Sequence, residues 1–257
     1  MTYKSIAISS GHGLYVRGAS SAQTGFDEVD EARILVDELA RELRHRGVTV
    51  YTFHDDTSKS QSENLNRIVN WHNAQPAHDL DISAHFNAYT YTTGARGVEV
   101  LYVSQQALAA ELSAAIAAAT QLPNRGAKHR SDLAFLNGTR APAVLLETVF
   151  VDAVQDVDAY RSCFEVVVNN ICTVLSGIGD EVTEPPETIE PPPVEVDALF
   201  KTRGKMSHFG GPTDTGVSPS EGLAFAFAGC YAPQPIGQRR TRRPSRQAAF
   251  LTPSSMK

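Results

Sequence analysis

The sequence predicts an α/β fold with a single sheet and helices on both faces, followed by a Pro/Glu-rich linker and a short C-terminal appendage. Strand-like apolar runs alternate with helix-like patterns up to about residue 178, as is typical of α/β proteins. An acidic, proline-rich stretch then interrupts the alternation, and a basic segment follows it. We therefore expect a folded domain over 1–178, an extended linker over 179–198 and a segment of unassigned role over 199–257.

Hydrophobic spacing predicts the elements of the domain in order. Residues 5–9 alternate polar and apolar side chains, as a half-buried strand does. Residues 27–47 carry apolar side chains at helical spacing and end in Gly47, a helix stop signal. The same criteria predict strands over 48–53, 79–87, 97–103 and 141–151, and helices over 60–75, 105–122 and 152–177. The strand over 141–151 is apolar throughout, so we expect it at the centre of the sheet.

The bulk composition excludes several classes of protein. Hydrophobic residues make up 42% of the 257 positions and charged residues 20%, which suits a globular domain with a sizeable core. The net charge of -6 argues against nucleic acid as a partner. The three cysteines lack CxxC spacing, so no thiolate zinc site is expected. The N-terminus lacks a secretory signal, and no apolar run is long enough to span a membrane.

Four polar residues fall where predicted strands end or helices begin, which is where α/β proteins carry their function. His12 follows the first strand between Gly11 and Gly13, which are expected to let the backbone turn and approach a ligand closely. Glu28 opens the first long helix, and His85 ends an apolar strand. Glu147 interrupts the most apolar strand of the chain, where a carboxylate is costly unless paired or bound to a cation.

Two histidines and a carboxylate form the open three-ligand set of catalytic zinc sites, and a second carboxylate could act as base. Each residue also has a structural alternative. Glu28 suits the first turn of a helix on its own, and His85 fits a hydrogen-bonded core position. Glu147 could form an ion pair with Arg67 or Arg125. His12, taken alone, fits a solvated turn.

Several other polar residues receive structural interpretations. Asn87 fits a turn after a strand better than a substrate contact, and Arg67 fits a structural ion pair on a helix. His72, His78 and His129 have no partners that the sequence reveals, so we expect them on the surface.

Several dispersed motifs resemble one family. "SSGHG", "ISAHFNA", "GVEVLY", "NRGAKHRSDLAFL" and "APAVLLETVFVD" follow one another in the order and spacing of the zinc-dependent N-acetylmuramoyl-L-alanine amidases, found among bacterial cell-wall amidases and phage endolysins. The resemblance runs from about residue 3 to 178. The chain departs from it at Val149, where many members have Gly, and at Asp152, where many have Asn.

The resemblance implies a zinc amidase-like catalytic domain that holds one Zn2+ per domain. It places His12, Glu28 and His85 at the metal-ligand positions and Glu147 at the position of the catalytic glutamate. The implied reaction is hydrolysis of the amide between N-acetylmuramic acid and L-alanine in peptidoglycan. Two alternatives remain: a zinc peptidase or amidohydrolase acting on another amide, and a non-catalytic cell-wall-binding protein.

The resemblance also suggests where the protein acts. A phage endolysin or a bacterial cell-wall hydrolase without a recognised signal would be made in the cytoplasm and act on the cell wall, in the host periplasm if it is a phage lysin. Residues 201–257 hold nine Lys or Arg against two Asp or Glu. We expect this end to be solvated and partly disordered, with attraction to an anionic cell wall as the weaker alternative.

Overall fold

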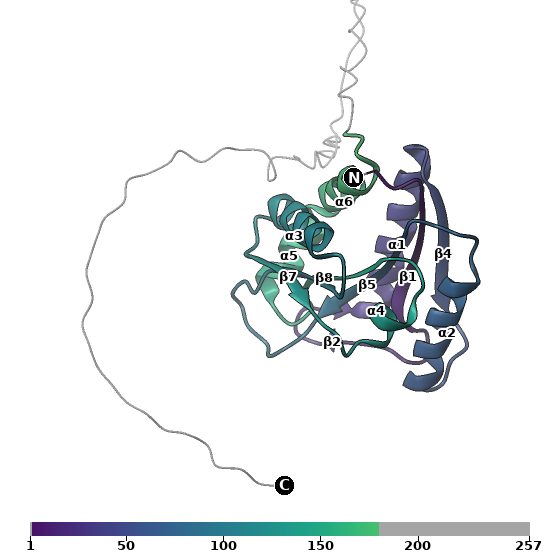
Figure 1. Cartoon of the computed structure of the whole chain (residues 1–257). Helices are drawn as coiled ribbons and strands as arrows, with labels where there is room; N and C mark the ends of the chain where they lie inside the picture. Colours follow the sequence, from purple (N-terminus) through teal and green to yellow (C-terminus); the bar gives the residue numbers. More distant parts are fainter. Residues whose placement is uncertain (1, 180–257) are drawn as a thin grey trace, which may run out of the picture. The chain divides into compact units, whose positions relative to one another are not determined.

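A six-stranded mixed sheet forms the centre of the structure, a computed structural model that describes residues 2–179 (Figure 1). The predicted C-terminal segment, and the linker from residue 180 on, lie outside the described residues. The strands lie in the order β4 (Thr49–Asp55), β1 (Ser5–Gly13), β5 (Leu80–Asn87), β8 (Ala143–Phe150), β6 (Val98–Tyr102) and β7 (Asn124–His129). The apolar strand β8 lies inside the sheet, as predicted.

The four strands from β4 to β8 are parallel, so their carboxyl ends meet at one edge. Strand β6 runs antiparallel to β8 and parallel to β7. A two-stranded ribbon of β2 (Ser20–Ser21) and β3 (Phe26–Asp27) follows β1 and leads into the first helix. The carboxyl ends of β1, β5 and β8 are therefore neighbours, and they position the residues discussed below.

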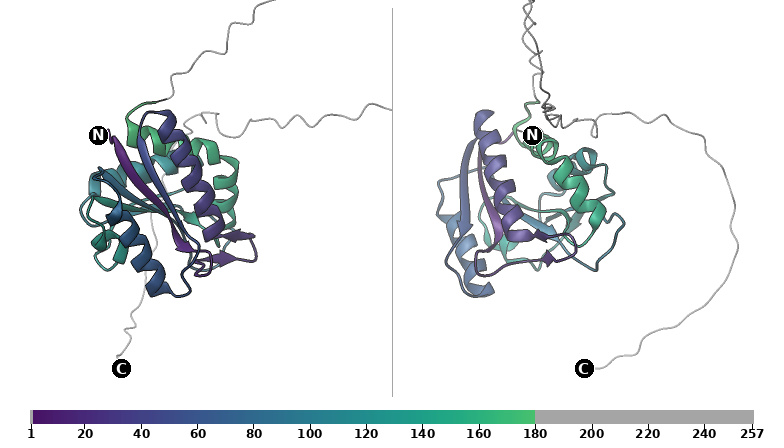
Figure 2. Two further views of the ribbon diagram at one scale, coloured as in Figure 1. Left: turned by 90° about the vertical axis from the view of Figure 1, so that its right-hand side faces the viewer. Right: turned by 180° about the vertical axis from the view of Figure 1, so that it is seen from behind.

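Helices cover both faces of the sheet, as predicted (Figure 2). One face carries α1 (Glu28–His45), α3 (Gln106–Thr120), α5 (Val154–Ser162) and α6 (Phe164–Ser176), whose apolar side chains join the main core. The other face carries α2 (Gln61–Ala74) and α4 (Ala134–Gly138) over a smaller apolar cluster. Within residues 2–179, none of these helices combines the length and apolarity needed to cross a membrane.

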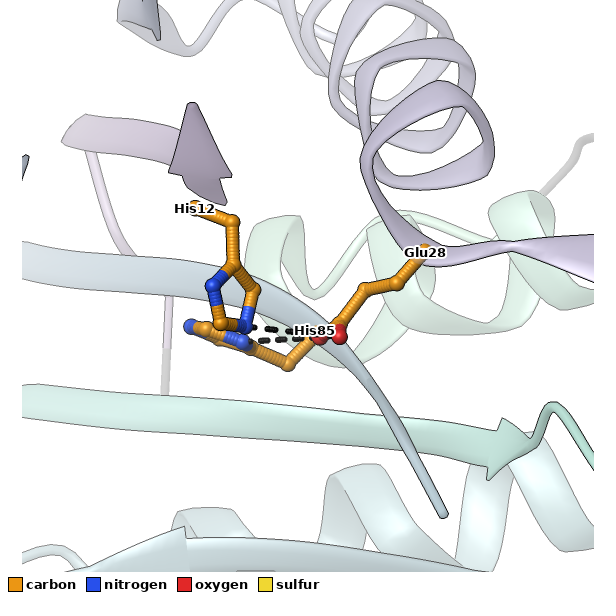
Figure 3. A group of neighbouring side chains, drawn as sticks. All are labelled: His12, Glu28 and His85. Atoms are coloured by element: carbon orange, nitrogen blue, oxygen red, sulfur yellow. Dashed lines mark hydrogen bonds and ion pairs between the residues drawn. The ribbon is translucent and has the colours of Figure 1, made fainter. Parts of the chain in front are cut away.

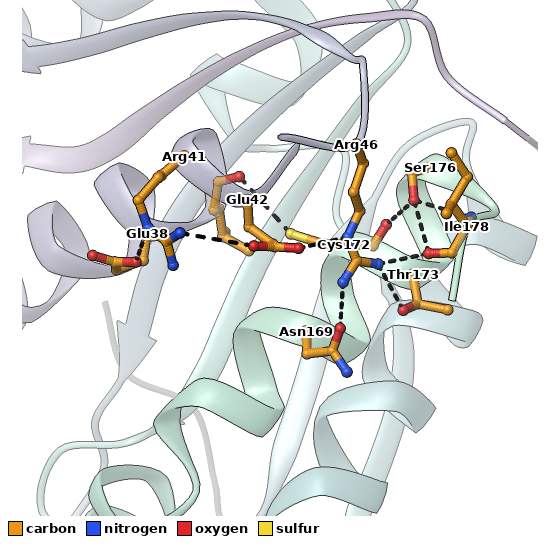
Figure 4. A network of polar contacts seen from close by, with 10 residues as sticks. Glu38, Arg41, Glu42, Arg46, Asn169, Cys172, Thr173, Ser176 and Ile178 are labelled. Carbon is orange, nitrogen blue, oxygen red and sulfur yellow. Dashed lines mark hydrogen bonds and ion pairs between the residues drawn. The ribbon is translucent and has the colours of Figure 1, made fainter. Parts of the chain in front are cut away.

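A polar network attaches α6 to the carboxyl end of α1 (Figure 4). Arg46, just after α1, bonds Glu42 from Nε at 2.8 Å and reaches across to Thr173 Oγ1 at 2.9 Å and the carbonyl oxygen of Ile178 at 2.6 Å. The Arg46 guanidinium also donates to the side-chain oxygen of Asn169. At 1.5 Å per residue, Arg46 lies about 27 Å along α1 from Glu28. The network therefore stabilises the end of the fold opposite the strand ends that carry the site.

The structure corrects two sequence-based expectations. The helix predicted over 152–177 is two helices, which break at Cys163. Buried Tyr160 and Val167 fall on one apolar spacing that continues across the break, so the pattern does not reveal it. Strand β7 was not predicted, because its sequence NRGAKH has no apolar alternation and it lies mostly exposed at the sheet edge. The short elements α4, β2 and β3 were also missed.

Candidate metal centre

His12 lies at the carboxyl end of strand β1, at the edge of the sheet where the parallel strands end. His12 itself adopts a left-handed backbone with φ 63°, whereas its two flanking glycines do not. A non-glycine residue in this region costs about 1–3 kcal/mol and persists only where the surroundings fix it, most often at functional sites. The expectation that Gly11 and Gly13 provide the turn is therefore wrong, because the left-handed backbone conformation is at His12.

The glycines around His12 provide space. A Cβ on Gly11 would lie 2.0 Å from Cε1 of His85, so the ring of His85 occupies the place of a side chain. A Cβ on Gly18 would lie 2.0 Å from Glu28 Oε2 and 2.5 Å from His12 Nε2. Gly13 faces away from the site, since its Cβ would approach Asn64 Nδ2 at 2.9 Å. Gly18 is a site residue that the sequence reasoning missed, because an isolated glycine in a loop carries no distinguishing pattern.

Glu28 is the first residue of α1, and its side chain is only 3% exposed. Asp27 caps the helix by accepting a hydrogen bond from the backbone N–H of Val29 at 3.0 Å. Two further backbone N–H groups orient the Glu28 carboxylate: Ala19 donates to Oε2 at 2.6 Å, and Phe86 donates to Oε1 at 3.0 Å. A buried carboxylate held by two fixed donors keeps one orientation, as metal-binding carboxylates commonly do.

The two imidazoles meet this carboxylate (Figure 3). His12 Nε2 lies 3.3 Å from Glu28 Oε2, and His85 Nδ1 lies 3.0 Å from Oε1. One possible ligand atom from each of the three residues lies within 4.8 Å of the others. Donors around a tetrahedral zinc with bonds of 2.0–2.1 Å are about 3.4 Å apart, so the two measured contacts match the spacing that a shared ion requires. The structure thus brings together all three predicted ligands in a set that fits zinc.

One buried carboxylate carries the negative charge of the site. Burial alone would raise the pKa of the Glu28 carboxyl, but hydrogen bonds and charge from His12 and His85 outweigh it and hold that pKa well below its usual range. Glu28 therefore remains ionised, and its negative charge faces two nitrogen donors. His12 and His85 are 27% and 18% exposed, so the site is open to solvent on their side.

Glu147 lies next to this cluster in the sheet. It is directly opposite His85 on the parallel strand β5 and directly opposite Glu99 on the antiparallel strand β6, so the three side chains share one face. Its Oε2 is buried and has no hydrogen-bond partner among the described residues. Burial raises the pKa of Glu147 to about 8, and the nearby charges of Glu28 and Glu99 add to this effect.

The alternatives left open for these residues can now be decided. Glu147 does not pair with either candidate arginine: Arg67 Nε lies 3.5 Å from Asp55 Oδ1, and Arg125 Nε lies 2.7 Å from Glu99 Oε2. The structural ion pair expected for Arg67 is thus confirmed. Asn87 donates from Nδ2 to Glu99 Oε1 at 2.9 Å, so it is engaged within the sheet beside the site.

Of the histidines expected on the surface, His72 is buried and His78 is half-buried. His72 is fully buried under the sheet, where its Nδ1 lies 2.6 Å from Asp81 Oδ1 and its Nε2 lies 2.9 Å from Ser9 Oγ. The side chain of His78 is 7% exposed and its Nε2 lies 2.7 Å from the same Asp81 oxygen. The sequence hid the pairing of His72 with Asp81 because one residue lies on α2 and the other on β5. His129 is exposed, as expected.

Fold and site together define an α/β domain with a preformed two-histidine, one-carboxylate centre at the carboxyl ends of its parallel strands. The family model described as N-acetylmuramoyl-L-alanine amidase matches residues 6–173. The chain therefore belongs to the N-acetylmuramoyl-L-alanine amidase family, a class of amide hydrolases.

Individual relatives agree with this assignment. The catalytic domain of the CD27L endolysin, targeting Clostridia Difficile, is 25% identical, with a TM-score of 0.61 over 69% of this chain and 99% of that one. An N-acetylmuramoyl-L-alanine amidase from Clostridium difficile 630 shares the fold, with 21% identity and a TM-score of 0.56 over 69% of this chain and 95% of that one. An uncharacterized protein of Clostridium perfringens is 31% identical over 163 residues, and the match covers 61% of this chain. The chain spans about half (46%) of that relative's length.

Proposed function

We propose that this protein is a zinc-dependent hydrolase that cleaves the amide between N-acetylmuramic acid and L-alanine in peptidoglycan. One observation carries the proposal: three metal-ligand donors meet around the buried carboxylate of Glu28, directly beside Glu147, whose Oε2 has no hydrogen-bond partner among the described residues. The family match over residues 6–173 supports the choice of this amide as the bond that is cleaved. His12, Glu28 and His85 would hold the zinc ion.

A bound zinc ion would act as a Lewis acid toward the scissile carbonyl and lower the pKa of a coordinated water to about 7. The chain's own residues do the remaining work. Glu28 stays ionised and oriented by the N–H groups of Ala19 and Phe86. The pKa of Glu147 is raised to about 8 in the site without a cation, and the positive charge of a bound zinc ion would lower it. The ionised Glu147, whose Oε2 has no hydrogen-bond partner among residues 2–179, would then accept the proton of the attacking water and return it to the departing amine of L-alanine.

The same residues weigh against a non-catalytic wall-binding role. A binding module needs neither a three-donor centre nor a glutamate whose buried Oε2 lacks a hydrogen-bond partner within residues 2–179. An unpartnered buried polar atom of this kind costs stability. Hydrolysis of another amide would use the same metal centre and differ only in the bond that is cleaved. Analysis of the products therefore distinguishes this alternative from the proposed reaction.

The test uses purified peptidoglycan, incubated with the full-length protein with and without a chelator, and chemical tagging of the newly exposed amines. We expect new N-terminal alanine that disappears with chelator and returns when zinc is added. New amines on other residues would show that the protein cleaves a bond within the stem peptide instead. An absence of new ends under every condition would refute the proposed reaction.

We further propose that the biological role is that of an endolysin. The similarity to an endolysin catalytic domain at 25% identity supports this role. Expression in the bacterial cytoplasm should leave cells intact until the membrane is permeabilised, and permeabilisation should then cause rapid lysis. Lysis that begins without permeabilisation would contradict this role.

A further inference from the structure

Exposed large apolar side chains occur on both loops that follow the histidine-bearing strands. Six such side chains occur among residues 2–179, and four of them lie on these loops: Leu14, Tyr15, Tyr89 and Tyr91. Tyr89 is the most exposed, at 79%. A large aromatic ring that is exposed to this extent is a candidate contact for a ligand.

The loop that carries Tyr89 is fixed to the neighbouring strand end. The backbone N–H of Tyr89 donates to Asp152 Oδ2 at 2.8 Å, and that of Thr92 donates to the carbonyl oxygen of Asp152 at 2.9 Å. The Arg96 guanidinium lies 5.0 Å from the ring centre of Tyr89 and 5.7 Å from that of Phe150. Tyr89 is therefore held in place while its ring remains in solvent, so binding a ligand would cost little ordering entropy.

Tyr89 also lies near the metal centre. It follows His85 by four residues, which span at most about 13 Å of extended chain. Its anchor Asp152 follows Glu147 by five residues and lies just beyond the end of the adjacent strand β8. A polymer bound at the centre through one of its units would reach Tyr89 with a neighbouring unit.

We propose that Tyr89 is a stacking platform for a sugar ring of the glycan strand, next to the muramoyl residue whose amide is cut. This inference rests on the proposed function. One face of a pyranose ring presents C–H groups, which pack well on the electron-rich face of an aromatic ring. A tyrosine with two side-chain torsions provides such contact area at low entropic cost.

The charges near Tyr89 favour a sugar over an acidic stem peptide as its occupant. Within residues 2–179, Arg96 is the only cation in contact with the ring. Its guanidinium already donates to the carbonyl oxygen of Thr90 at 2.5 Å and lies 4.0 Å from Asp152 Oδ1. Because Arg96 already contacts these two oxygens, the main contact that a ligand can make here is with the ring face of Tyr89.

The first test measures binding of a peptide-free tetrasaccharide of alternating N-acetylglucosamine and N-acetylmuramic acid to the full-length protein by calorimetry. This probe contains no scissile amide. We expect Tyr89→Ala to weaken binding by about 5–10-fold, the equivalent of one aromatic contact of about 1–1.4 kcal/mol. Tyr89→Phe should bind like the wild type. Ile34→Ala removes another exposed apolar side chain, on α1, and should have no effect.

The second test compares cleavage of a polymeric glycan with cleavage of a single muramoyl-peptide. Tyr89→Ala should lower kcat/KM on the polymer and leave it unchanged on the single unit, which also shows that the variant is folded. A protein that binds the tetrasaccharide but cuts no amide would refute the proposed function and leave the platform standing. Wild-type binding by Tyr89→Ala, a defect in Tyr89→Phe equal to that of Tyr89→Ala, or no tetrasaccharide binding by the wild type would overturn the platform.

Discussion

His85 and Glu147 lie directly opposite each other on the neighbouring parallel strands β5 and β8, with their side chains on the same face of the sheet. His85 contacts Glu28, whereas the Oε2 of Glu147 contacts no hydrogen-bond partner in the described part of the chain. The register of two central strands thus places a metal-ligand candidate and a proton-transfer candidate side by side. This separation of roles leads to the first prediction.

Glu147→Gln should keep zinc and lose activity. The amide has nearly the shape of the carboxylate but cannot accept the proton, so the rate should fall by about 10²–10⁴-fold, the usual share of a general acid or base. Zinc content and amide cleavage are measured on the same preparation. Glu111→Gln, an exposed position on α3, serves as control. Full activity of Glu147→Gln would reject the assigned role.

Gly18→Ala should weaken zinc binding although Gly18 is not a ligand. The added Cβ would lie 2.0 Å from Glu28 Oε2 and displace the carboxylate or the ring of His12. Changes that misorient metal ligands cost about 10–100-fold in affinity, so a similar loss is expected in a competition titration with a zinc chelator. Gly94→Ala is the matched control, since its nearest neighbour would lie at an ordinary 3.7 Å. Equal affinity in the two variants would contradict the geometry.

Asp55 should make folding stability depend on acidity. Burial alone would raise the pKa of its carboxyl, but hydrogen bonds from Ser58, Asn64 and the backbone of Thr57 hold that pKa well below the usual value. A depressed pKa stabilises the fold above the unfolded value of about 4, and this contribution is lost as the pH falls further. The wild type should therefore lose stability below about pH 4.

Denaturant unfolding between pH 2 and pH 7 measures this effect. Asp55→Asn should be less stable than the wild type at pH 7, and the two stability curves should converge in acid. Asp158→Asn, at an exposed position on α5, should follow the wild-type curve. A constant difference between Asp55→Asn and the wild type at every pH would show that the charge is not responsible.

Asp81→Ala should destabilise the fold strongly. Its carboxylate lies 2.6 Å from His72 Nδ1 and 2.7 Å from His78 Nε2 beneath the sheet, and the side chain is only 1% exposed. Removing one partner of a buried pair costs about 3–5 kcal/mol. Asp37→Ala removes an exposed partner of His54 and should cost about 0–1 kcal/mol. Similar unfolding free energies for the two variants would contradict this account of the buried network.

Much of the fold could be predicted because it depends on local spacing. The apolar positions of the first long helix, among them Leu35, Leu39 and Leu43, are fully buried against the sheet. The apolar strand with Glu147 lies inside the sheet. The break at Cys163 and the polar edge strand β7 could not be predicted, because apolar spacing continues across the first and is absent from the second.

The four site residues were found from the sequence because each sits at an element boundary or in an improbable setting. Their contacts depend on long-range folding, so the orientation of Glu28 by Ala19 and Phe86 could not be read from spacing. The pairing of His72 with Asp81 was hidden for the same reason. Gly18 could not be predicted, because it is needed only to leave space for Glu28 and His12, which the sequence does not show to be its neighbours.

The measurement that tests the central claim most directly is the zinc content of purified, metal-loaded protein by native mass spectrometry. The wild type should bind one zinc ion per chain, and His12→Ala and His85→Ala should each lose it. His129→Ala, which removes an exposed histidine, should keep it. A full equivalent of zinc in both His12→Ala and His85→Ala would show that the metal is held elsewhere and would contradict the assigned centre.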